Sequence, residues 1–247
     1  MNGAQHAGEL RELELAYDGV LRGLTSHFQP IVWTSDRRRY GYEALMRSSS
    51  RALPHPGAIL DAAERLERVT SLGRANRALV AEIIARAPVE RGVFFVNLHL
   101  QDVFDRSLVS PFAPLSKVAK RVVLEITERS SLEGAANLRY RVTELRELGF
   151  RIAIDDLGGG HARMGALTLS DTNFVKLDMS LVRDLDQHPV KQRLVRSIIQ
   201  LCSDQGIEVI GEGVETEGEA AVLKELGCHL LQGYLIARPA PAYCDPI

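Results

Sequence analysis

The chain has 247 residues, of which 45% are hydrophobic and 25% charged, and its formal net charge is -2. This length suffices for one large core, and the near-neutral charge implies no general attraction to a nucleic-acid polymer or an anionic membrane. The three cysteines lack close spacing, so we expect buried, reduced thiols rather than a disulfide framework or a zinc cluster. Because no apolar segment is long enough to cross a bilayer and the N-terminus lacks an apolar signal core, we expect a soluble, cytoplasmic protein.

The N-terminal part predicts one helix followed by two strands. We expect residues 1–8 to be disordered and residues 10–24 to be helical, because apolar side chains recur there at roughly helical spacing. Residues 28–33 predict a strand whose Pro30 suits an edge or an irregular strand. A second strand is expected over residues 40–47.

In that second strand the two-residue period places Glu43, Leu45 and Arg47 on one face. Opposite charges on an otherwise apolar strand have two interpretations. They form a buried salt bridge, or they form a polar floor for an anionic ligand.

The remainder of the chain alternates between helical and strand patterns. Helices are expected over residues 58–69, 72–87, 132–148, 163–169, 190–202 and 216–226, and strands over 93–98, 122–128, 152–156, 174–178, 207–212 and 230–233. Eight strands that mostly alternate with helices predict a parallel sheet closed into an α/β, TIM-like (β/α)8 barrel.

Polar side chains stand at or near the ends of these strands. They are Glu43, Asn97, Glu125, Asp155, Asp156, Lys176, Glu212 and Gln232. In a barrel of this class the active site lies at the C-terminal rim of the strands, so the fold would gather them. Carboxylate and amide oxygens suit Mg²⁺ or Mn²⁺ better than zinc, and this set is large enough for two ions.

The apolar run 152–154 ends in Asp155 and Asp156, and the glycines 158–160 follow. Two adjacent carboxylates repel each other, and each resists leaving water unless a cation compensates. This pattern indicates a metal site. The alternative is a solvated Asp-Asp turn that caps the next helix.

Two metals about 3.5–4 Å apart would activate a water and stabilise the leaving oxygen of a phosphodiester. Lys176 would supply a positive charge near that water, and Arg47 would hold a phosphate oxygen with its planar fork. Each residue also has an ordinary interpretation: Lys176 as a snorkelling side chain, Asn97 as a cap, Gln232 as part of a turn. Their joint position at strand ends favours the site.

In this order the residues resemble the EAL-domain cyclic di-GMP phosphodiesterases of bacteria, over about 21–239. Glu43-Ala44-Leu45, extended to Arg47, matches the signature, which alone would recur by chance. The ordered set is specific: Gln29-Pro30-Ile31-Val32, Asn97, Glu125-Ile126-Thr127-Glu128, Asp155-Asp156, Lys176-Leu177-Asp178, Glu212-Gly213-Val214-Glu215-Thr216 and Gln232-Gly233-Tyr234.

The resemblance implies a modified barrel whose first strand is antiparallel to the others. It implies hydrolysis of one phosphodiester bond of cyclic di-GMP to linear pGpG with two Mg²⁺ or Mn²⁺ ions. By the same resemblance the metal ligands are Glu43, Asn97, Glu125, Asp155, Asp156 and Glu212, with Asp155 as the bridge. Lys176 is the catalytic lysine; Arg47, Gln232 and Leu45 contact substrate. Glu128 anchors a loop, and Glu215 and Asp178 support the site.

The chain departs from the family pattern in one loop. Leu157, Gly159, His161, Ala162 and Arg163 stand where the family has Phe, Thr, an aromatic residue and two Ser. In the family this loop orders the second metal and contributes to dimer contacts. Ordering an extra glycine costs roughly 0.5–1 kcal/mol relative to alanine, so we expect weak or dimer-dependent activity. The tryptophan common after the signature is also absent.

We expect residues 1–20 to form an N-terminal extension and residues 21–247 the EAL phosphodiesterase domain. The resemblance also implies a homodimer and an upstream regulatory partner. One alternative is a catalytically weak or inactive EAL module that acts as a cyclic di-GMP receptor or a protein-interaction domain. Another is an enolase-like barrel with a lysine base and one Mg²⁺, which leaves Arg47 and the aspartate pair unexplained.

Overall fold

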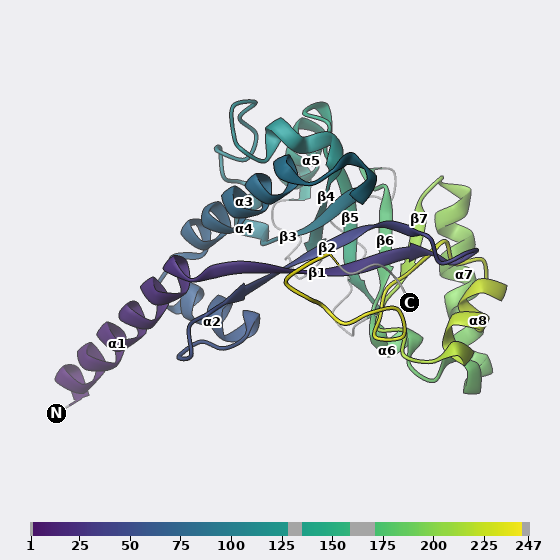
Figure 1. Ribbon diagram of the computed structural model, residues 1–247, viewed down its shortest axis with the longest axis horizontal. Helices are drawn as coiled ribbons and strands as arrows, with labels where there is room; N and C mark the ends of the chain where they lie inside the picture. Colours follow the sequence, from purple (N-terminus) through teal and green to yellow (C-terminus); the bar gives the residue numbers. More distant parts are fainter. Residues whose placement is uncertain (1, 128–134, 159–170, 244–247) are drawn as a thin grey trace.

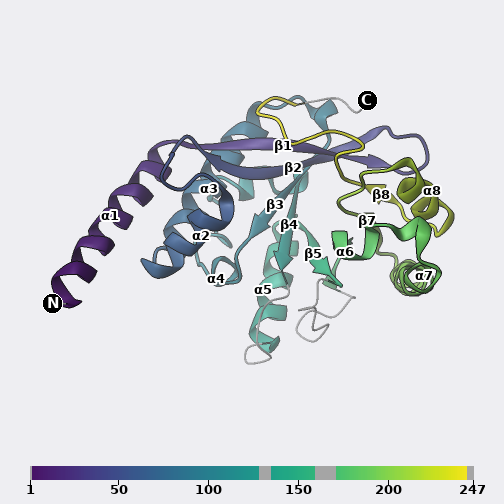
Figure 2. The same ribbon diagram turned by 90° about the horizontal axis from the view of Figure 1, so that it is seen from below.

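The computed structural model describes residues 2–127, 135–158 and 171–243. Within these ranges eight strands form a closed barrel in chain order (Figures 1 and 2). The strands are β1 (Leu24–Trp33), β2 (Arg39–Ser48), β3 (Val93–Leu98), β4 (Val122–Thr127), β5 (Arg151–Leu157), β6 (Phe174–Leu177), β7 (Glu208–Gly211) and β8 (Leu230–Leu231). The other strand pairs are parallel, whereas β1 runs antiparallel to β2 and β8. The predicted modified barrel is confirmed.

Helices flank the strands on several sides, whereas the C-terminal segment lies along β1 and bridges to it at Phe28 and Ala240 (Figures 1 and 2). The helices are α1 (Asn2–Arg22), α2 (Pro56–Arg65), α3 (Val69–Arg86), α4 (Leu100–Val103), α5 (Ala135–Glu147), α6 (Met179–Val182), α7 (Pro189–Asp204) and α8 (Glu217–Glu225), with short 3-10 turns at Val89–Arg91, Ser116–Arg121 and Leu185–Gln187. The predicted helix over 163–169 lies outside the described residues. Of the helices that are described, none has the length and apolar composition needed to cross a membrane.

The prediction of disorder over residues 1–8 is wrong for residues 2–8, because α1 already begins at Asn2. Tyr17 and Val20 in its C-terminal half are fully buried in a cluster with α2. Once that half is fixed, each further turn needs only propagation, and residues 2–8 contain no proline to stop it. The N-terminal half of α1 projects away from the barrel (Figure 1).

Strand β1 accommodates Pro30 through its irregular pairing. On one side β8 pairs with Val32 and Trp33, and Ala240 forms an isolated bridge to Phe28, so Pro30 lies between these positions. On the other side the register with β2 shifts between Ile31 and Val32. The predicted irregular strand is confirmed.

Side chains fill the inside of the barrel in two layers that differ in polarity. The apolar layer consists of Ile31, Phe95, Val123, Ala153, Phe174, Ile210 and Leu230, one from each strand except β2. The polar layer lies one inward position further toward the C-terminal ends of the parallel strands, because side chains on one face repeat every second residue. A larger apolar core separates the strands from the surrounding helices.

Cys202 and Cys228 are buried and free, as predicted. Burial raises the pKa of the Cys202 thiol to about 11 and that of Cys228 to about 12. Neither thiol is therefore a thiolate at neutral pH. Cys244 lies outside the described residues.

Candidate active site

The polar layer of the barrel converges on the ammonium group of Lys176, which projects inward from β6. Its Nζ lies 2.5 Å from Glu125 Oε1 and 2.6 Å from Glu212 Oε1. It lies 3.5 Å from both Glu43 Oε2 and Asp155 Oδ1. The Lys176 side chain is 1% exposed, so it does not snorkel to solvent. Acids from four different strands or strand ends therefore surround one buried cation.

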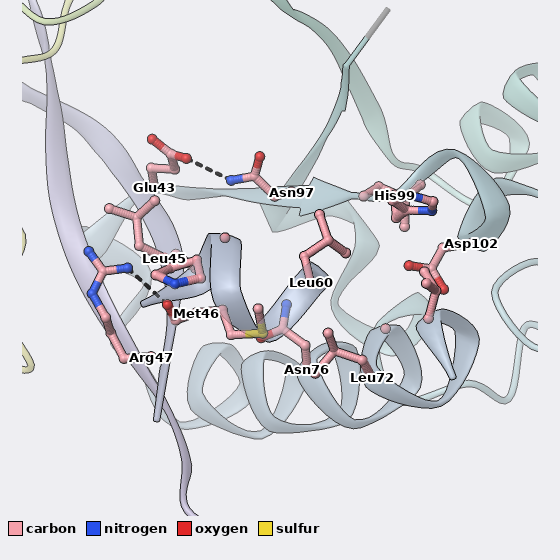
Figure 3. Close-up of a pocket in the computed structure, with 16 residues that line it drawn as sticks. Glu43, Leu45, Met46, Arg47, Leu60, Leu72, Asn76, Asn97, His99 and Asp102 are labelled. Atoms are coloured by element: carbon pink, nitrogen blue, oxygen red, sulfur yellow. Dashed lines mark hydrogen bonds between the residues drawn. The ribbon is translucent and has the colours of Figure 1, made fainter. Parts of the chain in front are cut away.

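Glu43 is held by amides from β3 and from the end of β8. Asn97 Nδ2 donates to Glu43 Oε1 at 2.7 Å, and Gln232 Nε2 donates to Glu43 Oε2 at 2.6 Å. Arg47, four residues further along on the same face, instead donates from Nη1 to the carbonyl oxygen of Met46 (Figure 3). The polar floor is therefore the interpretation that the geometry favours over a Glu43–Arg47 salt bridge.

Two consecutive carboxylates, Asp155 and Asp156, serve one site because the backbone leaves the strand conformation between them. In a regular strand their side chains would point to opposite faces. Asp156 instead has φ +60°, and the pairing of β5 with β6 is irregular between Ile154 and Leu157. Asp is one of the few residues that tolerate this left-handed region. As a result, oxygens of Asp155, Asp156 and Glu212 lie within 4.8 Å of one another.

These residues fit a divalent-cation centre. Glu125 is completely buried, and its Oε1 contacts the Lys176 ammonium group, whereas its Oε2 has no hydrogen-bond partner among the described residues. Asp155 Oδ1 has none either and lies 3.5 Å from Lys176 Nζ. Buried charged oxygens without partners are costly, and one lysine cannot neutralise four surrounding carboxylates. The donor set is all oxygen, which is the chemistry that Mg²⁺, Mn²⁺ and Ca²⁺ require.

Proton affinities in the centre reflect the same excess of negative charge. Burial, with the neighbouring Glu43 charge, raises the pKa of Glu125 well above its usual range. Burial also raises the pKa of Glu212, to about 8. Burial alone would raise the pKa of Glu43, but Lys176 and the two amide donors outweigh it and the pKa is lowered. Burial would lower the pKa of Lys176, but the surrounding acids raise it well above its usual value.

The supporting residues that the sequence predicted lie around the rim. Asp178 caps α6, accepting a hydrogen bond from the Ser180 backbone N–H at 2.9 Å. Glu215 forms a two-point ion pair with Arg183 at 2.5 and 2.7 Å. Glu128 and the loop residues 159–163 lie outside the described residues.

Sequence reasoning missed Gln29 as a site residue. Gln29 Oε1 accepts a hydrogen bond from Gln232 at 3.0 Å, and its Nε2 donates to the Ala237 carbonyl at 3.0 Å. It stands opposite Glu43 in the pairing of β1 with β2. Its position as a polar residue among the apolar residues of β1 could have identified Gln29 as a site residue.

Two cavities flank the carboxylates, and Glu43 lines both of them. The larger, of about 390 Å³, extends over Leu45 and Arg47 toward α2 and α3 (Figure 3). The smaller, of about 270 Å³, is lined by Asp156, Glu212, Gln232 and Tyr234 among others. A ligand that fills both would place its centre over the polar layer.

A closed barrel with an antiparallel first strand and a cluster of acids at its C-terminal mouth defines a modified TIM barrel with a candidate metal site. The sequence model of the EAL domain matches residues 14–239, and the chain belongs to the EAL domain family. The cyclic di-GMP phosphodiesterase PdeR of Escherichia coli (strain K12) is 30% identical over 232 residues, which cover 89% of this chain and 34% of PdeR.

Solved structures agree with this assignment. The Klebsiella pneumoniae BlrP1 complex with calcium and cyclic di-GMP has a TM-score of 0.79 and 26% identity, covering 91% of this chain and 58% of that one. The PaMucR phosphodiesterase complex with c-di-GMP has a TM-score of 0.77 and 27% identity, covering 90% of this chain and 98% of that one. BlrP1 was also solved with manganese and cyclic di-GMP.

The chain spans only part of its curated relatives. It covers 34% of PdeR and between 18% and 39% of several others. Activities of those longer proteins are properties of the whole chains.

Proposed function

We propose that this chain hydrolyses one phosphodiester bond of cyclic di-GMP to give linear pGpG, with two Mg²⁺ or Mn²⁺ ions in the polar layer. The observation that carries the proposal is the convergence of Glu43, Glu125, Asp155 and Glu212 on Lys176, between two cavities that share Glu43. A dinucleotide with a base on either side of its phosphodiester matches this arrangement. Membership of the EAL domain family supports the same substrate.

The residues that would hold the ions are Glu43, Asn97, Glu125, Asp155, Asp156 and Glu212, and Asp155 would be a ligand shared by both ions. Asn97 donates its amide nitrogen to Glu43, which leaves its carbonyl oxygen as the ligand. When bound, two divalent cations polarise a water and offset negative charge on the phosphate.

The remaining roles belong to the protein's own groups. Lys176 is charged, buried and held by acids on several sides, so it provides a fixed positive charge beside the attacking water. Arg47 presents a planar fork of donors at the edge of the larger cavity, where it binds a non-bridging phosphate oxygen. Gln232 holds Glu43 in place, and Leu45 forms part of the cavity wall.

The proposal is tested by incubating purified protein with cyclic di-GMP and Mn²⁺ and separating the products by chromatography. We expect pGpG from the wild type and none from Glu43→Gln or Lys176→Ala. Glu208→Gln is the matched control, because Glu208 is a half-buried glutamate at the opposite end of β7 from the site and should leave turnover intact. Cyclic di-GMP that binds tightly but is never cleaved by the wild type would refute hydrolysis.

That last outcome would favour the second candidate, a receptor or interaction module that binds cyclic di-GMP without turnover. Its motivation is the unusual sequence Leu157, Gly159, His161, Ala162 and Arg163 after the aspartate pair. Calorimetric titration in EDTA distinguishes the two, since a receptor would bind the nucleotide without metal.

We further propose that residues 21–247 form the phosphodiesterase domain and residues 1–20 an extension, and that the protein is a cytoplasmic homodimer with an upstream regulatory partner. Light scattering coupled to gel filtration tests the dimer. A mass equal to the 27.3 kDa monomer at micromolar concentration would contradict it.

A further inference from the structure

The larger cavity contains two buried polar side chains that the proposed chemistry does not use. Asn76 of α3 is 8% exposed, and Asp102 of α4 is 3% exposed. Both line the cavity. In Figure 3 they lie well away from Glu43 and Asn97, which mark the catalytic side.

Asp102 enters this region through space left by a glycine. A Cβ atom at Gly73, in the interior of α3, would lie 2.2 Å from both carboxylate oxygens of Asp102. Glycine at an interior helix position costs about 1 kcal/mol relative to alanine. At position 73 that cost is offset by room for a carboxylate supplied by another helix.

A buried arginine holds Asp102 in this position. Arg77 Nη1 lies 2.7 Å from Asp102 Oδ1, and its Nη2 donates to Asp105 Oδ2 at 2.6 Å. Asp105 is also bound by Arg74 and Ser107, and it does not line the cavity. Burial raises the pKa of Asp102, and the Arg77 charge partly opposes that rise. Arg77 therefore fixes the position of Asp102, while Asp105 anchors Arg77 from behind.

Both cavity residues still offer acceptors. Within the described part of the chain, Asn76 Oδ1 has no hydrogen-bond partner, and Asp102 Oδ1 accepts no hydrogen bond despite its ion pair with Arg77. A buried acceptor left unmatched costs about 1–3 kcal/mol, so such groups are normally matched by a donor. The rest of the wall is largely apolar, with Leu60, Val69 and Leu72, which suits the faces of a flat ring.

We propose that Asp102 and Asn76 form a base-recognition pocket that selects guanine over adenine. The inference rests on the proposed function, because it assigns one base of the cyclic dinucleotide to the larger cavity. Guanine presents adjacent N1–H and N2–H donors, which a carboxylate accepts together. Adenine presents an acceptor at N1 and no amino group at C2, so it leaves Asp102 unpaired.

Binding of three cyclic dinucleotides tests the assignment: cyclic di-GMP, cyclic di-AMP and cyclic di-IMP, which keeps N1–H but lacks the N2 amino group. Titrations are done by calorimetry with Ca²⁺ in place of Mn²⁺. For the wild type we expect cyclic di-GMP to bind at least about 100-fold more tightly than cyclic di-AMP, with cyclic di-IMP between them.

Asp102→Asn should weaken cyclic di-GMP binding at least about 10-fold and remove most of the preference over cyclic di-AMP. Gly73→Ala displaces the Asp102 carboxylate without removing its charge, so it should also weaken cyclic di-GMP binding and reduce the preference over cyclic di-AMP. If Asp102→Asn fails to fold, Gly73→Ala tests the inference in its place. Asp105→Asn is the matched control: it perturbs the same buried ion pairs but should keep the guanine preference.

Equal guanine preference in the wild type, Gly73→Ala and folded Asp102→Asn would overturn the inference while leaving pGpG formation untouched. A wild type that binds cyclic di-AMP as tightly as cyclic di-GMP would overturn it as well. A wild type that neither binds nor cleaves cyclic di-GMP would instead refute the proposed function itself.

Discussion

The apolar and polar layers inside the barrel are built by the same strands, two residues apart. Val123 precedes Glu125, Phe174 precedes Lys176, and Ile210 precedes Glu212. In β1 the order is reversed, Gln29 before Ile31, because that strand runs the other way. The apolar layer is stabilised by excluding water, and the polar layer by pairing opposite charges. The same strand geometry therefore supports a hydrophobic layer and, two residues further along, an ionic one.

The largest effect on the difference between the two layers is expected when the Lys176 charge is removed from the polar layer. Lys176→Met keeps the side-chain length but leaves four carboxylates around a neutral group. We expect turnover to fall at least about 1,000-fold. Chemical denaturation in EDTA should show the free energy of unfolding lowered by roughly 3–5 kcal/mol. Mn²⁺ should restore part of the stability but not the turnover; unchanged stability in EDTA would contradict the central role of Lys176.

The corresponding change in the apolar layer is Phe174→Ala, two residues before Lys176 on the same strand. It leaves a cavity among ring contacts with Phe95 and Tyr40 and should cost about 3–5 kcal/mol. Because no charge is involved, denaturation curves with and without Mn²⁺ should give the same loss. A loss that depends on the metal would show that the two layers are not independent.

The third prediction concerns pH in the metal-free protein. Burial raises the pKa of Glu212 to about 8 and that of Glu125 well above its usual range. Between the ordinary glutamate pKa of about 4.3 and about 8, the folded state therefore holds protons that the unfolded state has released. The free energy of unfolding should fall with rising pH across this window, by roughly 1–4 kcal/mol.

Glu43 has the opposite sign: its lowered pKa gives stability that is present at neutral pH and lost on the acid side. Denaturant midpoints measured from pH 5 to pH 9 in EDTA check the slope, which Glu212→Gln should reduce. Saturating Mn²⁺ should remove the slope by stabilising the ionised carboxylates. If the free energy of unfolding of Glu212→Gln fell with pH as steeply as that of the wild type, the protons released in this window would belong to groups other than Glu212.

The smallest effect is expected at the rim, where polar groups remain hydrated. Asp178→Ala removes the cap of α6 and should lower the free energy of unfolding by about 1 kcal/mol. Asp178→Asn keeps an acceptor at the cap and should be nearly neutral. A loss in Asp178→Asn as large as in Lys176→Met would mean that the carboxylate charge belongs to the polar layer after all.

The strand order and the converging acids could be predicted because they depend on short patterns. An apolar run predicts a strand, and an acid at the end of that run marks the C-terminal end of the strand, where the site of a barrel lies. The turn at Asp156 could not, since its positive φ depends on how β5 meets β6. Asn76 and Asp102 were invisible for a similar reason: each lies on a helix, and only the space at Gly73 makes their positions informative.

Gln232, just after the last strand, donates to Gln29 of the first strand and to Glu43 of the second. These bonds join positions 203 and 189 residues apart in the chain. Contacts of such long range form late in folding, because loop-closure entropy opposes them until the intervening elements are in place. A chain that lacks the final strand therefore carries the acids without the amide that orients Glu43, and the polar layer is complete only when β8 closes the barrel.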